Sequence, residues 1–519
     1  MDKLILKSEN LMMIKSHLTI ILNQFLVNQI KLVLDLLFNT KWVDSKICRT
    51  GRMPNLRRAT DVVFAVVVTA WISASACAAA ESPAVQRYEP DWTSLDARPL
   101  PAWYDQSKFG VFIHWGVYSV PAFGSEWFWM NWRGRKGANY VNFMAKNYKP
   151  GFTYQEFGPQ FTAEFFDPMQ WASIIKDSGA KYVVLTTKHH EGYTLWPSKK
   201  SFGWNSVDVG PHRDLVGDLS RAIRSLNKTR FGVYHSLYEW FNPLWLQDKQ
   251  SNLTTRTFVT EKVLPELYEL VNHYKPEIIW SDGEWEAPDT YWDSLNFLAW
   301  LYNDSPVKDT IVVNDRWGGD TLCKHGGFLT CADRYQPGKV VGRKWENAMT
   351  IDKYSWSYRR NARALDVYSI QNLIAQLVET VSFGGNLLLN ISPTSDGMIP
   401  PLHEERLLQI GQWLSVNGES IFGSNPWSTC QNDTQQPHLW YTQGKNSSTI
   451  YSIVLKWPDG NLLSSACLDK LDIESIVMLD TQSKLKWSQK TEGGLMIKLE
   501  DKSKTKTEWG WVLRVTLNP

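Results

Sequence analysis

Short apolar runs that end in polar residues recur along the first four-fifths of this chain, and they limit what it can fold into. The runs are residues 109–113, 182–187, 231–236, 278–280 and 310–313, and segments with helical periodicity between and after them are residues 168–178, 214–226, 259–274, 291–302 and 370–381. Strands and helices that alternate at this spacing predict a parallel sheet covered by helices. Because polar residues collect at the strand ends, we expect a (β/α) barrel, TIM-like, whether regular or irregular in detail. No GxGxxG motif follows the first run, so a dinucleotide-binding fold lacks its main support.

The last part of the chain has a different pattern. After about Pro426, short strand-like runs are separated by Gly, Asn, Asp and Ser, with no helical pattern between them. The runs are residues 439–442, 450–455, 476–479, 496–499 and 510–515. We therefore predict a large α/β barrel domain over residues 84–425 and a smaller C-terminal β-sandwich over residues 426–519.

Residues 53–80 have the pattern of a secretory signal peptide. Arg57 and Arg58 form a basic start, residues 62–72 an apolar core that is short for a bilayer, and residues 76–80 a small-residue cleavage region. Since a signal normally begins a chain, residues 1–52 are interpreted as an upstream extension. The alternative is an internal signal anchor that holds the protein in a membrane.

Cysteine usage and glycosylation sequons agree with the secretory route. Removal of the signal leaves four cysteines, Cys323, Cys331, Cys430 and Cys467, which allow three pairings. Cys323 with Cys331 is favoured because a short loop separates them, and this leaves Cys430 with Cys467. Sequons for N-glycosylation occur at Asn227, Asn252, Asn303, Asn390, Asn432 and Asn446. The net charge of +2 gives no reason to expect nucleic acid or an anionic membrane as a partner.

The clearest functional signal lies at residues 278–285. An apolar run that ends at Trp280 leads directly into Asp282, Gly283 and Glu284. Parallel-sheet enzymes place their chemistry at the C-terminal ends of strands, where Asp282 falls, and an indole such as Trp280 offers a flat face to a sugar ring. The 27 tryptophans of the chain fit carbohydrate handling. The simpler alternative is a surface turn, since Asp-Gly is a common turn dipeptide.

Polar residues at the predicted strand ends are the candidates for chemistry. They are His114, Glu126, His189, His190, Glu191, Tyr234, Glu239, Asp282, Glu284, Asn314, Asp315, Arg316, Asp333 and Glu346. No serine lies in a GxSxG elbow and no Cys/His pair offers a thiolate, so paired carboxylates are the chemistry that is left. A retaining glycosidase needs an ionised carboxylate and a protonated acid about 5–5.5 Å apart. His189 and His190 could instead bind a metal, but adjacent residues on a strand point to opposite faces, which favours a metal-free site.

Six stretches resemble, in order, the signature stretches of the α-L-fucosidases of glycoside hydrolase family 29, of the animal lysosomal or tissue type. They are residues 112–116, 125–127, 188–192, 280–285, 314–318 and 384–390. The likeness runs from about Tyr88 to the C-terminus. Each stretch alone is a weak signal, whereas six in register are specific.

The resemblance implies roles for individual residues. Asp282 would be the nucleophile that attacks the anomeric carbon of fucose. The sugar pocket would be lined by His114, Glu126, Trp127, His189, His190, Tyr234 and Arg316, with Trp280 beside the nucleophile. Two residues compete for the role of acid/base. Glu346 aligns with the residue first proposed for animal members and is narrowly preferred, and Asp333 is the rival beside a predicted disulfide loop.

The chain is thus predicted to be a retaining exo-α-L-fucosidase, lysosomal or secreted, that removes terminal fucose from glycoproteins and oligosaccharides by double displacement. Its partners would be fucosylated glycans and glycoproteins, without nucleic acid, and without a membrane unless the signal is retained as an anchor. It should need no cofactor and no metal, and the resemblance favours a homo-oligomer. One alternative is an inactive, lectin-like fucose-binding protein. Another is a metal-dependent hydrolase that uses the histidines.

Overall fold

The computed structural model describes residues 87–518. The predicted upstream extension and signal peptide, and with them the alternative of a membrane anchor, lie outside the described residues. Within residues 87–518, each helix is too short or too polar to cross a membrane.

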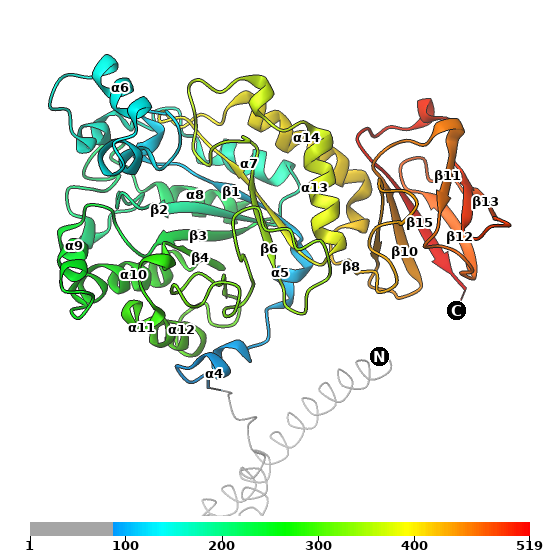
Figure 1. Cartoon of the computed structure of the whole chain (residues 1–519), viewed down its shortest axis with the longest axis horizontal. Helices are drawn as coiled ribbons and strands as arrows, with labels where there is room; N and C mark the ends of the chain where they lie inside the picture. The colour runs from blue at the N-terminus through cyan, green and yellow to red at the C-terminus, as the bar shows by residue number, and fades with distance from the viewer. Residues whose placement is uncertain (1–86, 519) are drawn as a thin grey trace, which may run out of the picture. The chain divides into compact units, whose positions relative to one another are not determined.

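Seven parallel strands form one curled sheet in the larger domain (Figure 1). They are β1 (Phe109–Ile113), β2 (Tyr182–Lys188), β3 (Arg230–Ser236), β4 (Ile278–Asp282), β5 (Val312–Val313), β6 (Glu346–Thr350) and β7 (Asn386–Ile391), in the order β5-β4-β3-β2-β1-β7-β6. The strands are apolar without alternation because both faces are buried. In β2, Tyr182 and Val184 pack inside the curl, and Val183 and Leu185 pack in the larger core that also holds the helices. The TIM-like fold is confirmed.

The curled sheet is closed by an irregular segment between its two edge strands. The amides of Gly327 and Phe328 donate to the carbonyl of Val313 in β5, and Leu329 exchanges hydrogen bonds with Lys344 and Glu346 at the start of β6. Residues 327–329 therefore stand where a regular barrel would have another strand, which makes the barrel irregular.

Helices cover the outside of the sheet (Figure 1). The main ones are α5 (Ala102–Ser107), α6 (Ala138–Asn147), α7 (Pro168–Asp177), α8 (Leu215–Ser225), α9 (Pro243–Gln250), α10 (Leu264–Tyr274), α11 (Asp289–Trp292), α12 (Ser294–Asn303), α13 (Ile370–Ser382) and α14 (Pro401–Asn417). The helix predicted over residues 291–302 is divided, because Asp293 adopts a left-handed conformation between α11 and α12. Helices α5, α6, α9 and α14 were not predicted from the sequence pattern.

The C-terminal part is built from two antiparallel sheets. One contains β8 (Asn425–Pro426), β9 (Leu439–Gln443), β10 (Thr449–Val454), β12 (Ile473–Met478) and β15 (Trp511–Leu517), and the other contains β11 (Leu462–Ser465), β13 (Lys486–Gln489) and β14 (Leu495–Lys498). Residues of both sheets share one apolar core, as in a sandwich. Disulfides join Cys430 to Cys467 here and Cys323 to Cys331 in the barrel, so both predicted pairings are confirmed.

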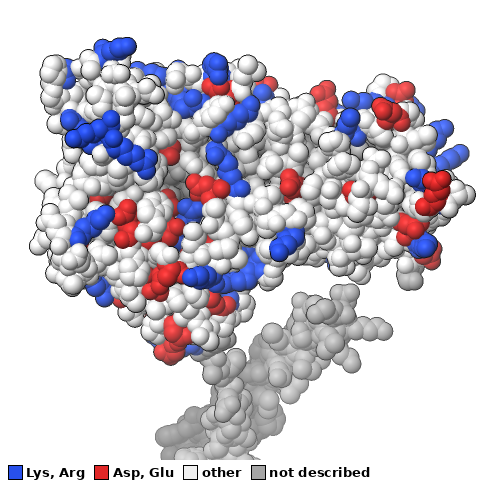
Figure 2. Space-filling model, viewed as in Figure 1, with Lys and Arg blue, Asp and Glu red and all other residues white. Residues whose placement is uncertain are grey.

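Helices α13 and α14 lie between the barrel strands and the sandwich (Figure 1). The indole Nε1 of Trp413 donates to the carbonyl of Gly510 at 2.9 Å, and the ring of Phe383 meets that of Trp440 edge-on. On the face shown in Figure 2, Lys and Arg are interspersed with Asp and Glu.

Candidate active site

A pocket opens at the C-terminal ends of the barrel strands. It is lined by Phe112, His114, Glu126, Trp127, His189, His190, Tyr234, Trp280, Asp282, Trp285, Arg316, Asp333 and Trp356. These side chains come from strands β1, β3 and β4 and from the segments that follow the strands. The structure therefore brings together ten of the eleven predicted site residues.

Asp282 is the last residue of β4, and its carboxylate is held on both oxygens. Oδ2 accepts a hydrogen bond of 2.6 Å from the phenol of Tyr234, and Oδ1 accepts one of 2.8 Å from Nη1 of Arg316. The strand stops here because Gly283 takes a left-handed conformation, with φ of +82°. The side chain of Asp282 is thus fixed in one orientation at the pocket wall.

Arg316 links Asp282 to a second carboxylate. Its Nη2 donates to Oδ1 of Asp333 at 2.8 Å, and its Nε donates to Thr330 at 3.0 Å. Burial alone would lower the pKa of Arg316, but the charges of Asp333 and Asp282 raise it well above its usual value. The two carboxyl groups differ in exposure, since the Asp282 side chain is 12% exposed and that of Asp333 is 50% exposed.

The loop that carries Asp333 is held by a disulfide and by a buried carboxylate. The disulfide between Cys323 and Cys331 ends two residues before Asp333. The buried carboxylate of Asp315 accepts hydrogen bonds from the amides of both cysteines, at 2.9 and 3.1 Å. The exposed side chain of Asp333 is therefore attached to a segment of backbone that is held in place.

Two pocket histidines are neutral. Burial lowers the pKa of His114 and of His190 well below the usual value. Nδ1 of His114 lies 2.6 Å from Oδ1 of Asn390, whose amide group donates to a carbonyl, so Nδ1 must carry the proton. Nδ1 of His190 likewise lies 2.6 Å from Ser236, whose hydroxyl donates to a carbonyl. In His114, Nε2 is left to accept a hydrogen bond from a ligand hydroxyl, whereas Nε2 of His190 lies 3.5 Å from Oδ2 of Asp282.

Aromatic rings form the walls of the pocket. Tyr234 stacks on Trp280 with ring centroids 5.8 Å apart, and Trp127 stacks on Trp285 at 6.1 Å. Glu126 is buried beside them, which raises its pKa, and it accepts a hydrogen bond of 3.2 Å from the amide of Ser357. Flat apolar faces beside convergent acceptors and carboxylates suit a sugar, which has both C–H and hydroxyl surfaces.

Glu346 does not line the pocket with the other candidates. It is the first residue of β6, at the opposite end of the strand from the pocket, and it is fully buried inside the barrel. Its carboxylate accepts hydrogen bonds from the phenols of Tyr104 and Tyr182, each at 2.6 Å, and from Nε1 of Trp280 at 2.9 Å. Trp280 contacts both the pocket and Glu346, so this carboxylate supports the pocket floor.

His189 and His190 do not point to opposite faces of a strand, contrary to the prediction. Both rings line the pocket, with centroids 4.0 Å apart, because the residues lie in the loop after β2 and not within a strand. Alternation of side chains therefore does not apply to them. Within residues 87–518, no group of three or more metal-ligating side chains is found.

Phe112 and Trp356 also line the pocket and were not predicted from the sequence, whereas the indoles that flank Asp282, Trp280 and Trp285, were expected to face a sugar. Phe112 lies inside a quoted signature stretch, which could have identified it. A buried charge network was missed as well: Lys188 bonds Glu239 and Glu266, each at 2.9 Å, and Lys262 bonds Glu266 at 2.8 Å.

Comparisons with known proteins agree with this site. A family model described as alpha-L-fucosidase matches residues 75–419, and one described as the alpha-L-fucosidase C-terminal domain matches residues 431–516. An alpha-L-fucosidase of Branchiostoma floridae is 55% identical over 432 residues, which cover 83% of this chain and 96% of that protein. The tissue alpha-L-fucosidase of Homo sapiens is 55% identical over 433 residues, covering 83% of this chain and 92% of that protein.

A solved structure is similar over the same region. The alpha-fucosidase of Thermotoga maritima, in complex with a mechanism-based inhibitor, superposes with a TM-score of 0.72 at 34% identity, covering 83% of this chain and 100% of that chain. Together with a carboxylate-lined, aromatic-walled pocket at the strand ends, this fold defines a glycoside hydrolase, and the chain is therefore an enzyme. It belongs to the α-L-fucosidase family.

Proposed function

We propose that this chain is a retaining exo-α-L-fucosidase that hydrolyses terminal α-L-fucose from glycoproteins and oligosaccharides. The observation that supports it best is the arrangement around Arg316, whose guanidinium binds Asp282 and Asp333 with one Nη each, at 2.8 Å. Retention requires two carboxyl groups about 5–5.5 Å apart, and one guanidinium spans a gap of that order.

In the proposed first step, a carboxylate oxygen of Asp282 attacks the anomeric carbon and the glycosidic bond breaks. Asp333 gives its proton to the departing oxygen, and a glycosyl ester on Asp282 results. In the second step, Asp333 takes a proton from water, the water oxygen bonds to the anomeric carbon, and Asp282 leaves as a carboxylate. His114 would accept a hydrogen bond from a sugar hydroxyl, and Tyr234 would hold the nucleophile, with the His190 ring beside it.

We prefer Asp333 to Glu346 as the acid/base. Asp333 lines the pocket and is half exposed, so it can reach a leaving group at the rim, whereas Glu346 lies below Trp280. A carboxylate held by a guanidinium cannot donate a proton. We infer that the contact between Asp333 and Arg316 opens when the sugar fills the pocket, which the exposure of Asp333 permits.

Azide rescue with an aryl α-L-fucoside tests both roles. Asp282→Ala should lower kcat about 10³-fold or more, and azide that replaces the missing nucleophile should give the β-fucosyl azide. Asp333→Ala should lose about 10²- to 10⁴-fold on substrates with poor leaving groups. In the Asp333→Ala variant, azide that attacks the glycosyl ester on Asp282 should give the α-fucosyl azide.

The two azide products separate the possible results. An α-azide from Glu346→Ala, with no rescue of Asp333→Ala, would assign the acid/base to Glu346. Wild-type protein that binds fucose without releasing it from any fucoside would support the lectin-like alternative. A product of inverted configuration from the wild-type protein would exclude the double displacement.

We infer that the enzyme acts in the lysosome or outside the cell. Two disulfides support an oxidising compartment, and the exposed Asn227 can carry glycan. Fractionation of expressing cells and medium, with glycosidase treatment of the product, tests this. Light scattering on the purified protein tests the predicted homo-oligomer.

A further inference from the structure

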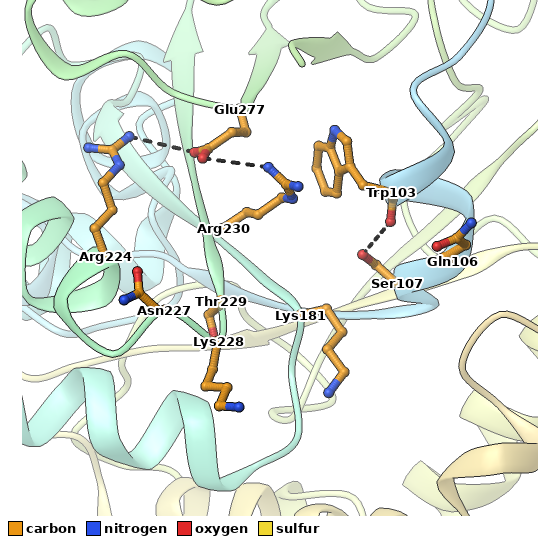
Figure 3. Close-up of a pocket in the computed structure, with 10 residues that line it drawn as sticks. All are labelled: Trp103, Gln106, Ser107, Lys181, Arg224, Asn227, Lys228, Thr229, Arg230 and Glu277. Atoms are coloured by element: carbon orange, nitrogen blue, oxygen red, sulfur yellow. Dashed lines mark hydrogen bonds and ion pairs between the residues drawn. The ribbon is translucent and has the colours of Figure 1, made fainter. Parts of the chain in front are cut away.

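A cavity of about 600 Å³ lies at the end of the barrel opposite the active site (Figure 3). It is lined by Trp103, Gln106, Ser107, Lys181, Arg224, Asn227, Lys228, Thr229, Arg230 and Glu277. Lys181 directly precedes β2, Arg230 begins β3 and Glu277 directly precedes β4, so the cavity lies at the N-terminal ends of the strands. In barrel enzymes this end serves stability and the C-terminal end serves catalysis. The catalytic pocket therefore does not explain the charged groups gathered here.

The cavity contains four cationic side chains and one carboxylate. Arg224 and Arg230 share Glu277, with N–O distances of 3.5 and 3.8 Å. Arg224 also donates to the carbonyl of Lys275 at 2.8 Å, and the guanidinium of Arg230 lies 4.6 Å from the centre of the Trp103 ring system. The arginines are thus held in the wall, as Figure 3 shows.

The charges of Lys181 and Lys228, unlike those of the arginines, have no carboxylate partner in the described part of the chain. No carboxylate of residues 87–518 lies within ion-pair distance of Lys181 or Lys228. Nζ of Lys181 lies 4.2 Å from the centre of the Phe422 ring. Burial lowers the pKa of Lys181, and the charge of Lys228 lowers it further. Two ammonium groups that repel one another in a cavity with a net charge of about +3 favour an anion between them.

We propose that this cavity binds a phosphate or sulfate group, either free or carried on a sugar. Arginine presents its N–H groups as a planar fork that fits two oxygens of a tetrahedral anion, and lysine adds a point charge without a fixed direction. The side chain of Gln106 also lines the cavity and can contact whatever carries the anion.

The test uses the full, processed protein and the variant Lys181→Gln/Lys228→Gln. The substitution at Lys228 leaves the Asn-Lys-Thr sequon of Asn227 usable, so glycosylation is unchanged. The control Lys484→Gln/Lys486→Gln removes the same charge from exposed positions of the sandwich. Inorganic phosphate, and separately a hexose 6-phosphate, are titrated by calorimetry at constant ionic strength, with saturating fucose in the active site.

We expect saturable binding of phosphate to the wild type and the control, and a Kd at least about tenfold weaker in the cavity variant. All three proteins should hydrolyse an aryl fucoside equally, since the cavity is remote from the pocket. Tighter binding of the hexose phosphate would identify a sugar-borne anion, and equal binding a free one. If the double variant does not fold, the exposed Lys228→Gln alone should weaken binding about threefold or more. Equal Kd values in all variants, or no binding of either probe, would overturn the proposal.

Discussion

The phenol of Tyr234 donates a hydrogen bond of 2.6 Å to Oδ2 of Asp282. In the proposed second step Asp282 would leave the sugar as a carboxylate, and the phenol would stabilise its negative charge. A hydrogen bond to a charged group contributes about 1.5–3 kcal/mol, so Tyr234→Phe should slow turnover roughly 10- to 100-fold. Stopped-flow kinetics should also show a burst of released aryl alcohol. Tyr441→Phe is the control, because Tyr441 donates to Asp433 at 2.9 Å in the sandwich, and this variant should turn over like the wild type.

Glu346→Gln should destabilise the protein while it leaves kcat nearly unchanged. An amide cannot accept from all three donors that surround Glu346, so at least one buried donor loses its partner, at a cost of about 1–3 kcal/mol. Denaturant unfolding and steady-state kinetics at a single temperature measure the two effects separately. If turnover instead slowed by about two orders of magnitude while stability stayed that of the wild type, the acid/base role would return to Glu346.

Glu284→Gln should stabilise the protein more at pH 8 than at pH 5. Burial raises the pKa of Glu284 from 4.5 to about 8. Below pH 4.5 the group is protonated in both states, and its contribution to stability is fully present. Between pH 4.5 and 8 the unfolded state releases the proton and the folded state keeps it, so stability is lost as the pH rises. The glutamine variant does not titrate, and its Tm advantage over the wild type should grow across this range. The exposed Glu405→Gln should show no such trend.

Trp285→Ala should change the preference for what is attached to fucose. Trp285 is 44% exposed at the pocket rim and stacks on Trp127, so its outer face can contact the next sugar. We expect KM for fucosylated oligosaccharides to rise roughly 2- to 10-fold, with kcat/KM for a small aryl fucoside unchanged. An equal effect on both substrates would place Trp285 in the fucose pocket proper.

Lys188→Met should be strongly destabilising. The ammonium group is fully buried between Glu239 and Glu266. Its removal takes away a positive charge that pairs with both buried carboxylates. Breaking a buried ion pair costs about 3–5 kcal/mol, which urea unfolding can measure. Lys199→Met, an exposed residue in the loop that follows β2, is the control and should unfold like the wild type.

The fold was predictable to the extent that local patterns determine it. Apolar runs gave β1 to β5 to within two residues at each end, because strands buried on both faces need continuous apolar sequence. Strands β6 and β7 were not predicted as strands. Strand β6 begins with Glu346 and Asn347, whose partners come from distant parts of the chain. The closure of the barrel at residues 327–329 depends on hydrogen bonds to both edges of the sheet and has no periodic signal.

The active site, too, was predictable only where local sequence patterns determine it. Asp282 could be identified because its strand, its glycine and its tryptophans are neighbours in sequence. The sequence could not distinguish the roles of Asp333 and Glu346. The two residues are close in sequence, and what separates them is the end of the barrel at which each one lies. Only the three-dimensional structure shows that Glu346 begins its strand while the pocket lies where the strands end.

The contact between the barrel and the sandwich bears on how the chain can be shortened. Ile453 and Val512 of the sandwich belong to the same apolar core as Ile374 and Trp413 of the covering helices. A truncation near residue 425 would expose the apolar surface of helices α13 and α14 to water, and the truncated protein should aggregate.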